Sequence, residues 1–132
     1  MYCRFKIVFY DTGKGFIIMI SEEQLAKEFT QVLDRIYPRV GRQLHRCYVK
    51  VVEFYVKRLG RRLHYIVIYS PSYLCPALQV QRGILREVAE NMGLMDVVIV
   101  NATQLLRDPM SKIKQEDSRF WLELHWIATQ ED

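Results

Sequence analysis

The stretch from Arg39 to Tyr69 constrains the fold of this chain more than any other part, because it contains two β-rich runs joined by a short turn. The first run extends from Arg46 to Lys57, and the second extends from Leu63 to Tyr69. The connection between them reads Arg58-Leu59-Gly60-Arg61-Arg62. Two such runs joined by a short connection that contains glycine are typical of a β-hairpin. We therefore predict a long hairpin in the middle of the chain.

Positive charge is concentrated in this hairpin. From Arg39 to Arg62 there are eight Lys or Arg residues against one acid, Glu53, although the formal net charge of the whole chain is only +4. Tyr48 and Tyr55 lie among these cations, and surfaces that bind RNA or DNA combine cations with aromatic rings in this way. The alternative is an ordinary solvated hairpin whose charges prevent edge-to-edge aggregation.

Length and composition indicate one globular domain. A chain of 132 residues with 50% hydrophobic residues can bury a substantial core. The sequence has no apolar run of the roughly 18 residues that a membrane span needs. The N-terminal segment Met1 to Lys6 carries charges where a signal peptide needs its apolar segment. We expect a soluble protein with no membrane partner.

The cysteines favour a reducing compartment. Cys3, Cys47 and Cys75 are isolated, odd in number and without a Cys-x-x-Cys pair. This pattern argues against a disulfide framework, and it also argues against a structural zinc site, whose ligands usually come in close pairs.

The order of predicted elements gives the expected fold. A period of two predicts a strand over residues 3–10, and Ser21 with Gln24 forms a capping box at the start of a helix over residues 21–36. The hairpin follows, then a helix over residues 77–92 and a buried strand over residues 96–101. The order β-α-β-β-α-β predicts an α+β, ferredoxin-like sandwich: a four-stranded antiparallel sheet with two helices on one face.

We expect this domain to span residues 1–107, followed by a C-terminal extension, residues 108–132, with an aromatic-rich helix. The first hairpin strand changes the parity of its apolar positions, so we expect a β-bulge near Val51 and Val52 that gathers its charged residues on the exposed face of the sheet.

Two sets of candidate site residues follow. Residues expected to bind RNA, or else an acidic partner, are Arg4, Lys6, Arg42, Arg46, Tyr48, Lys50, Tyr55, Lys57, Arg58, Arg61 and Arg62. Residues expected at a protein interface are Ile66, Ile68, Phe120, Trp121 and Trp126, because apolar side chains of a second sheet face and of an aromatic tail need a cover.

Motifs of catalysis are absent from the sequence. There is no Gly-x-Gly-x-x-Gly, Walker loop, nucleophile elbow or His-x-x-x-His. The three histidines, His45, His64 and His125, are scattered, and Glu53 with Asp96 is only a generic carboxylate pair for two-metal nuclease chemistry. We therefore expect no catalytic activity, metal, cofactor or small-molecule substrate.

The chain resembles the small α/β protein subunits of ribonuclease P and ribonuclease MRP, and among these the smaller, more divergent of two paralogous members. The resemblance is carried by the stretches 4–9 and 11–15 (Asp-x-Gly-x-Gly), by Glu23-Gln24-Leu25 leading to Ile36-Tyr37 and Gly41, by Ile66-Val67-Ile68 and by residues 98–106. One stretch departs from the family: Asn101-Ala102-Thr103-Gln104-Leu105 stands where the larger paralogue has Ser-Gly-Thr-Ile-Lys.

The resemblance implies a non-catalytic subunit that pairs with its paralogue inside a ribonucleoprotein of the nucleus or nucleolus. The RNA of that particle would carry out the phosphodiester chemistry on precursor tRNA, and the proteins would position it. Two other hypotheses stay open from the residues alone. One is a protein–protein module that forms an obligate dimer without nucleic acid, and the other is a small nuclease or transposon-type enzyme.

Overall fold

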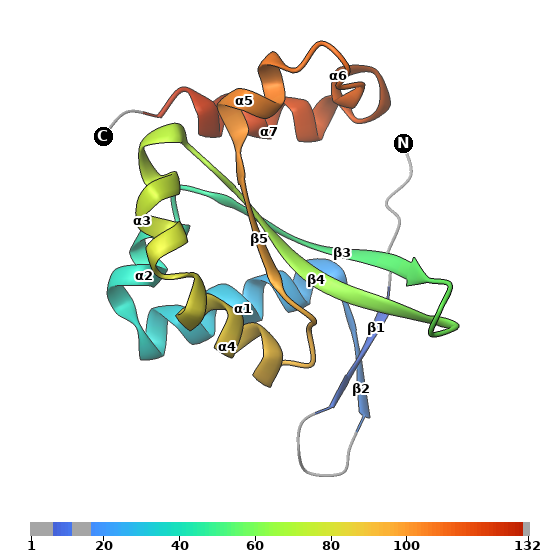
Figure 1. Cartoon of the computed structure of the whole chain (residues 1–132). Coiled ribbons are helices and arrows are strands. Elements are labelled where there is room, and N and C mark those ends of the chain that lie inside the picture. Colours follow the sequence, from blue (N-terminus) through green and yellow to red (C-terminus); the bar gives the residue numbers. More distant parts are fainter. Residues whose placement is uncertain (1–6, 12–16, 131–132) are drawn as a thin grey trace.

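Strand β4 (Arg61–Ser70) is the centre of the main sheet of this protein (Figure 1). In the computed structural model, which describes residues 7–11 and 17–130, β4 pairs with β3 (Tyr48–Val56) on one side and with β5 (Val97–Asn101) on the other. The β3–β4 pairing is antiparallel, whereas the β4–β5 pairing is parallel. Strands β1 (Ile7–Asp11) and β2 (Ile17–Ser21) form a separate two-stranded antiparallel sheet.

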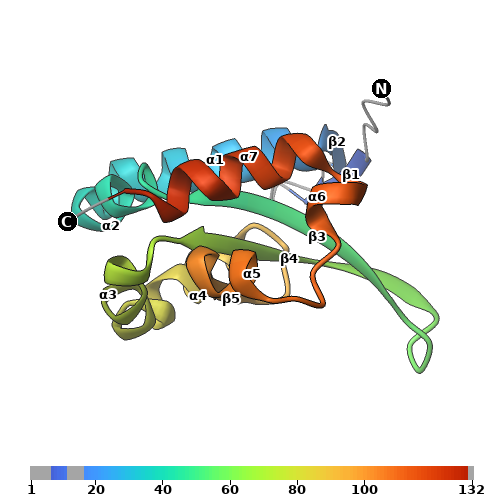
Figure 2. The same cartoon turned by 90° about the horizontal axis from the view of Figure 1, so that it is seen from above.

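Helices cover both faces of the main sheet. Four of them pack on one face, and the C-terminal helices lie on the other (Figures 1 and 2). The first group comprises α1 (Glu22–Ile36), α2 (Pro38–Leu44), α3 (Cys75–Val80) and α4 (Arg82–Asn91), with a short 3₁₀ turn, η1 (Ser72–Leu74), before α3. The second group comprises α5 (Ala102–Arg107), α6 (Ile113–Glu116) and α7 (Ser118–Ala128).

Local sequence determines where α1 begins. The Ser21 side chain accepts a hydrogen bond from the backbone N–H of Gln24 at 3.0 Å, which is the N-cap contact expected from the capping box. The stripe of apolar residues that follows is buried, and it includes Leu25, Phe29 and Leu33. The predicted helix is therefore confirmed. Beyond its end at Ile36, Pro38 occupies the first turn of α2, where the missing N–H of proline costs nothing.

The main core lies between the sheet and α1 to α4. The sheet contributes Val51, Ile66, Ile68 and Val97, all almost completely buried. Side chains alternate along a strand, so Tyr48 and Tyr69 point to the opposite face, where they pack with α7. Strand β4 is thus enclosed on both faces over its C-terminal half.

The expected fold is correct at the level of α+β and wrong beyond that level. The sheet is three-stranded and mixed, not four-stranded and antiparallel, and its helices lie on both faces. In a ferredoxin-like sheet another strand separates the two strands that a helical crossover connects. Here β4 and β5 are directly hydrogen-bonded from Ile66 to Ser70, so no position remains between them for an N-terminal strand.

Two finer expectations also differ from the structure. The β3–β4 register runs without interruption from Tyr48–Tyr69 to Val56–Arg61, so the bulge expected near Val51 and Val52 is absent. The helix expected over residues 77–92 is divided at Gln81 into α3 and α4. The buried strand expected after it is present as β5.

The aromatic C-terminal segment folds onto the sheet. The Asp117 side chain accepts a hydrogen bond from the Phe120 N–H at 3.0 Å and caps α7. Leu124 and Ile127 of α7 are buried, and they form a second cluster with Ala102 and with the two tyrosines of the sheet. Among residues 7–11 and 17–130, no helix combines the length and the apolar character that crossing a bilayer requires.

Replacing Leu124 with alanine should lower the free energy of unfolding by about 2–5 kcal/mol, because the change removes buried methyl groups and leaves a cavity under α7. Leu122→Ala is the matched control, since Leu122 lies on the same helix but is 61% exposed, and it should change stability by less than about 0.5 kcal/mol. Urea denaturation followed by circular dichroism measures both values. Equal, small effects would show that α7 does not pack on the sheet.

Candidate functional site

The free end of the β3–β4 hairpin carries a group of exposed cations. It extends past both layers of helices (Figure 2). Strand β5 pairs with β4 only from Ile66 to Ser70, and the Met95 N–H donates to the His64 carbonyl at 2.8 Å. Beyond that point β4 continues with β3 as its partner. The short β5 therefore leaves the end of the hairpin as a two-stranded ribbon.

The turn at this end exposes four cations. Its closing bond runs from the Gly60 N–H to the Val56 carbonyl at 2.9 Å, and the φ of +62° at Gly60 is one that a residue with a Cβ rarely adopts. The cations of this end, which we call the hairpin cations, are exposed: Lys57, Arg58, Arg61 and Arg62. Tyr55 is 60% exposed and lies directly opposite Arg62 in the ladder.

One carboxylate offsets part of this charge. Glu53 Oε1 lies 3.2 Å from Nη1 of Arg62, and the arginine side chain is 74% exposed. An ion pair with so exposed a partner contributes little to stability. The other three hairpin cations, Lys57, Arg58 and Arg61, have no carboxylate at ion-pair distance among the described residues.

The structure separates the other residues that were expected to bind RNA. Tyr48 and Lys50 lie on the face that α7 covers: the Tyr48 and Phe120 ring centroids are 5.5 Å apart, and Lys50 Nζ lies 4.5 Å from the Phe120 centroid. Arg42 and Arg46 are exposed near the opposite end of β3, which is roughly 30 Å from the hairpin turn for a nine-residue strand. Arg4 and Lys6 lie outside the described residues.

The residues that were expected at a protein interface lie in different environments, some buried and one exposed. Ile66 and Ile68 are completely buried in the core of the chain itself, so they are not part of any exposed surface. Phe120 packs against the sheet tyrosines. Trp121 is half-buried, with its ring centroid 4.7 Å from that of His125, whereas Trp126 is 59% exposed.

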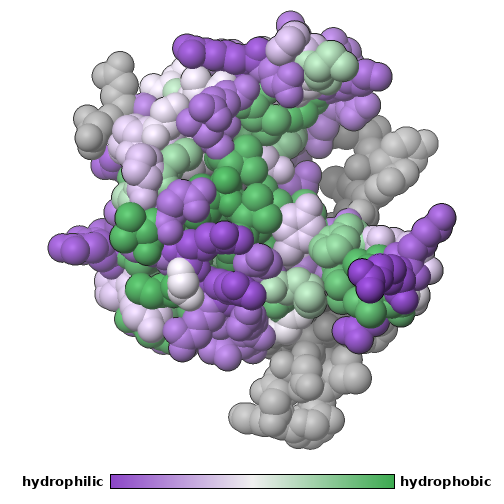
Figure 3. Space-filling view, in the orientation of Figure 1, coloured by the Kyte–Doolittle hydropathy of each residue, from purple (hydrophilic) through white to green (hydrophobic). Residues whose placement is uncertain are grey.

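The sheet face beside α7 is apolar rather than basic. Without the bulge, the residues that follow Tyr48 and Lys50 on this face of β3 are apolar, and Phe54 stacks edge-to-face on Tyr65 with centroids 5.1 Å apart. Figure 3 shows apolar side chains gathered between the C-terminal helices and the hairpin. Val98 of β5, which lies opposite Val67 in the β4–β5 ladder, is 40% exposed. The basic face predicted from the sequence is thus reduced to the end of the hairpin.

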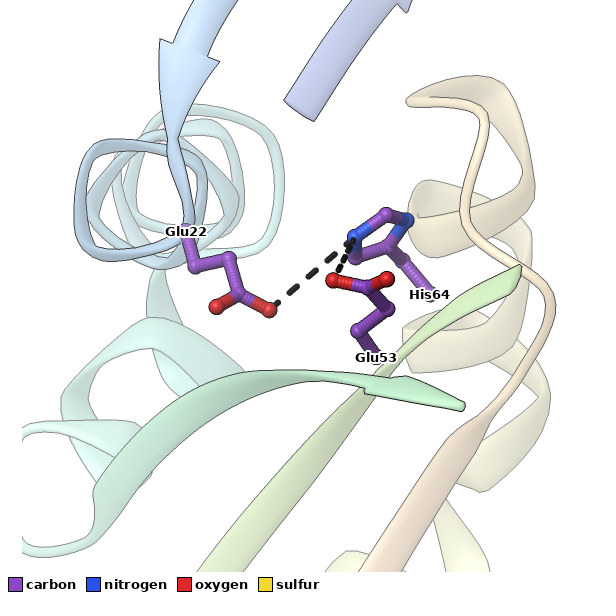
Figure 4. Close-up of side chains that lie close together, drawn as sticks. All are labelled: Glu22, Glu53 and His64. Atoms are coloured by element: carbon purple, nitrogen blue, oxygen red, sulfur yellow. Dashed lines mark ion pairs between the residues drawn. The ribbon is translucent and has the colours of Figure 1, made fainter. Parts of the chain in front are cut away.

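A cluster of ionisable side chains lies at the base of the hairpin, on the face that α1 covers (Figure 4). Glu22 comes from the first turn of α1, Glu53 from β3 and His64 from β4. The His64 Nε2 atom is 3.8 Å from Glu53 Oε2 and 4.0 Å from Glu22 Oε2. All three side chains are mostly buried, with exposed fractions of 15–18%. The three groups point toward one common position.

Sequence reasoning missed this cluster. Glu53 and His64 are opposite one another in the β3–β4 ladder, a pairing that the correct register would have predicted. Glu22 joins them only because α1 begins at this end of the sheet, and no sequence spacing signals that approach.

Cys47, at the other end of the sheet, has an unreactive thiol. Burial raises the pKa of the Cys47 thiol to about 12, although a hydrogen bond with Ser70 opposes this effect. The Sγ atom lies 3.5 Å from the Gln43 carbonyl oxygen, to which it donates. A thiol with so high a pKa is not a nucleophile near neutral pH.

Comparisons of the chain with protein families, with curated proteins and with solved structures found no match. A functional assignment therefore rests on the geometry of the described residues.

The tyrosines beneath α7 predict a loss of stability at high pH. Burial raises the pKa of Tyr69 to about 12, from an ordinary value of 10. The folded state thus favours the neutral phenol, and this contribution to the free energy of unfolding is complete below pH 10 and lost as the pH rises through 12. Tyr69→Phe should reduce the fall in stability between pH 10 and 12.

Tyr55→Phe is the control, because Tyr55 is 60% exposed and its hydroxyl stays in contact with water in the folded state. Denaturant unfolding at a series of pH values measures the effect. The same pH dependence in wild type and in both variants would contradict the burial of Tyr69.

Proposed function

We propose that this protein is a non-catalytic RNA-binding subunit of a ribonucleoprotein, and that it contacts the phosphate backbone of structured RNA with the end of the β3–β4 hairpin. The observation that carries the proposal is the set of exposed hairpin cations on a ribbon that extends beyond the helices.

Phosphate binding requires cations that are not already neutralised. Among the hairpin cations only Arg62 has a carboxylate, Glu53, within ion-pair distance in the described part of the chain. The remaining cations all come from the short segment 57–61, so they are close neighbours along the backbone. Such a cluster neutralises neighbouring phosphates and gains free energy from the release of counterions.

An aromatic ring beside the cations favours RNA over an acidic protein. Tyr55 and Arg62 are cross-strand neighbours, and both side chains are exposed. Unpaired RNA bases stack on tyrosine rings and on guanidinium planes, whereas acidic side chains gain nothing from a tyrosine face. The ribbon therefore offers one contact for phosphates and another for a base.

The resemblance to ribonuclease P and MRP subunits supports the same proposal and narrows it. Under that resemblance the subunit acts in 5′ maturation of precursor tRNA in the nucleus, together with a paralogous protein. The chemistry belongs to the RNA, and the hairpin of this chain would help to hold that RNA in place.

A protein–protein module without nucleic acid is the second candidate. The observation that favours it is the apolar surface near α7, where Leu122 and Trp126 are 61% and 59% exposed. Both residues line the same shallow hollow, together with Glu123. The two candidates differ in their response to salt, because apolar association is not weakened by added salt as phosphate contacts are.

Replacing Lys57, Arg58 and Arg61 together with glutamine should weaken RNA binding by about tenfold or more near 100 mM salt, because each substitution removes a cation that neutralises a phosphate. It should also lower the slope of log K against log salt by about 2–3, since fewer counterions are then released on binding. The measurement is fluorescence anisotropy with a labelled stem-loop RNA over a series of salt concentrations. Arg62 is kept so that its pair with Glu53 stays intact.

The matched control removes the same charge from the other end of the molecule. Arg35, Arg39 and Arg42 are exposed at the end of α1 and in α2, and their triple glutamine variant should bind RNA nearly as wild type does. Equal losses of affinity in both triple variants would mean that RNA responds only to net charge. No change in the hairpin variant would overturn the proposal.

A further inference from the structure

We propose that Glu22, Glu53 and His64 bind one divalent transition-metal ion at the base of the hairpin (Figure 4). The site goes beyond the RNA-binding role proposed above, which depends on different residues. Its role would be structural: the ion would join the start of α1 to both strands of the hairpin.

The geometry suits a single ion. One ligand atom from each residue lies within 4.8 Å of the other two, and the two distances from His64 Nε2 are 3.8 and 4.0 Å. Atoms at these separations have a common point about 2.5 Å from each, and Zn²⁺ or a similar ion binds nitrogen and oxygen at about 2.0–2.2 Å. A contraction of a few tenths of an ångström would complete the coordination.

The donor set selects the class of metal. One imidazole nitrogen with two carboxylate oxygens suits Zn²⁺, Mn²⁺ or Fe²⁺, whereas Ca²⁺ and Mg²⁺ prefer oxygen ligands alone. Three protein ligands leave one or more positions for water, and the side chains retain enough exposure, 15–18%, for water to reach the site.

Glu53 can serve the metal without giving up its other contact. Its Oε1 atom pairs with Arg62 at 3.2 Å, while its Oε2 atom faces His64. The ion pair with Arg62 occupies one oxygen of this carboxylate, so the other oxygen is available to a metal ion. Arg62, one of the hairpin cations, therefore contacts a ligand of the proposed metal site.

The competing arrangement has no metal and places a protonated His64 between the two carboxylates. The chain contains a natural comparison for that case. His45 lies 3.0 Å from Asp34, but in the described part of the chain that is the one carboxylate within ion-pair distance of it, and its side chain is 61% exposed. A site for a metal ion differs from such a pair by its third ligand and its burial.

Titration of the 132-residue chain with Mn²⁺, followed by the electron paramagnetic resonance signal of free Mn²⁺, tests the proposal. Mn²⁺ is the probe because it favours imidazole and carboxylate over the thiols of the chain. We expect one equivalent of Mn²⁺ to bind, with affinity falling as the pH is lowered, because protons compete with the metal for the ligand atoms. The ion should also raise the melting temperature of the chain.

Three isosteric or near-isosteric variants, Glu22→Gln, Glu53→Gln and His64→Gln, should each weaken Mn²⁺ binding by about tenfold or more. His45→Gln is the control and should bind as wild type does. Binding that is equal in all four variants, or the absence of saturable binding by wild type up to about 1 mM, would overturn the proposal.

A measurement on the wild-type chain covers the case in which the variants fail to fold. Mn²⁺ broadens the amide resonances of residues close to it, so one equivalent should selectively broaden those of Glu22, Glu53 and His64. Broadening centred on Asp34 and His45, or spread over all exposed acids, would contradict the site.

Discussion

The structure depends on the two hydrogen-bonded ladders of β4. One ladder joins β4 to β3 along nine residue pairs, and the other joins it to β5 along five. Parallel strands need a crossover connection, which η1, α3 and α4 provide, and this connection covers one face of the sheet. The alternation of Ile68 and Tyr69 then directs one side chain to the main core and the next to the cluster beneath α7. The main sheet and the side-chain clusters on both of its faces therefore depend on this strand.

The unequal lengths of the two ladders leave the end of the hairpin as a two-stranded ribbon. Where β5 stops, the sheet narrows from three strands to two, and the hairpin continues with fewer neighbours. The cluster of Glu22, Glu53 and His64 lies at this transition, and the hairpin cations lie beyond it. A metal ion at the transition would hold the ribbon against α1, and the ribbon would then present its cations and Tyr55 in a fixed direction. The proposed metal site is thus adjacent to the proposed RNA-binding site, and the Arg62–Glu53 ion pair joins the two.

The elements that local chemistry determines could be predicted from the sequence. The cap at Ser21 and the stripe of Leu25, Phe29 and Leu33 predicted α1, and alternating apolar residues around a glycine turn predicted the hairpin. The parallel pairing of β4 with β5 and the separate β1–β2 sheet could not be predicted, because contacts between distant segments decide them. The parity of Val51 and Val52 was misleading for a related reason: both faces of the sheet carry apolar residues, so an apolar residue does not identify its face.

The candidate sites also divide into residues that are neighbours in sequence and residues that only the fold brings together. The hairpin cations are close together in sequence, and they remain together in the structure. Tyr48 and Lys50 were grouped with them, but Phe120 of the C-terminal helix covers both, and nothing in the hairpin sequence signals that cover. The proposed metal ligands combine a helix start with two strands, so only the folded chain brings them together.

The central claim is that RNA contacts the end of the hairpin in the cell. The most direct test is ultraviolet cross-linking in the cells that naturally produce this protein. The chain is then purified, and its RNA-linked peptides are identified by mass spectrometry. We expect nucleotides attached to the peptide that contains Tyr55, and a recovered RNA with extensive secondary structure. Cross-links confined to other surfaces, or a chain recovered with proteins and no RNA, would contradict the claim.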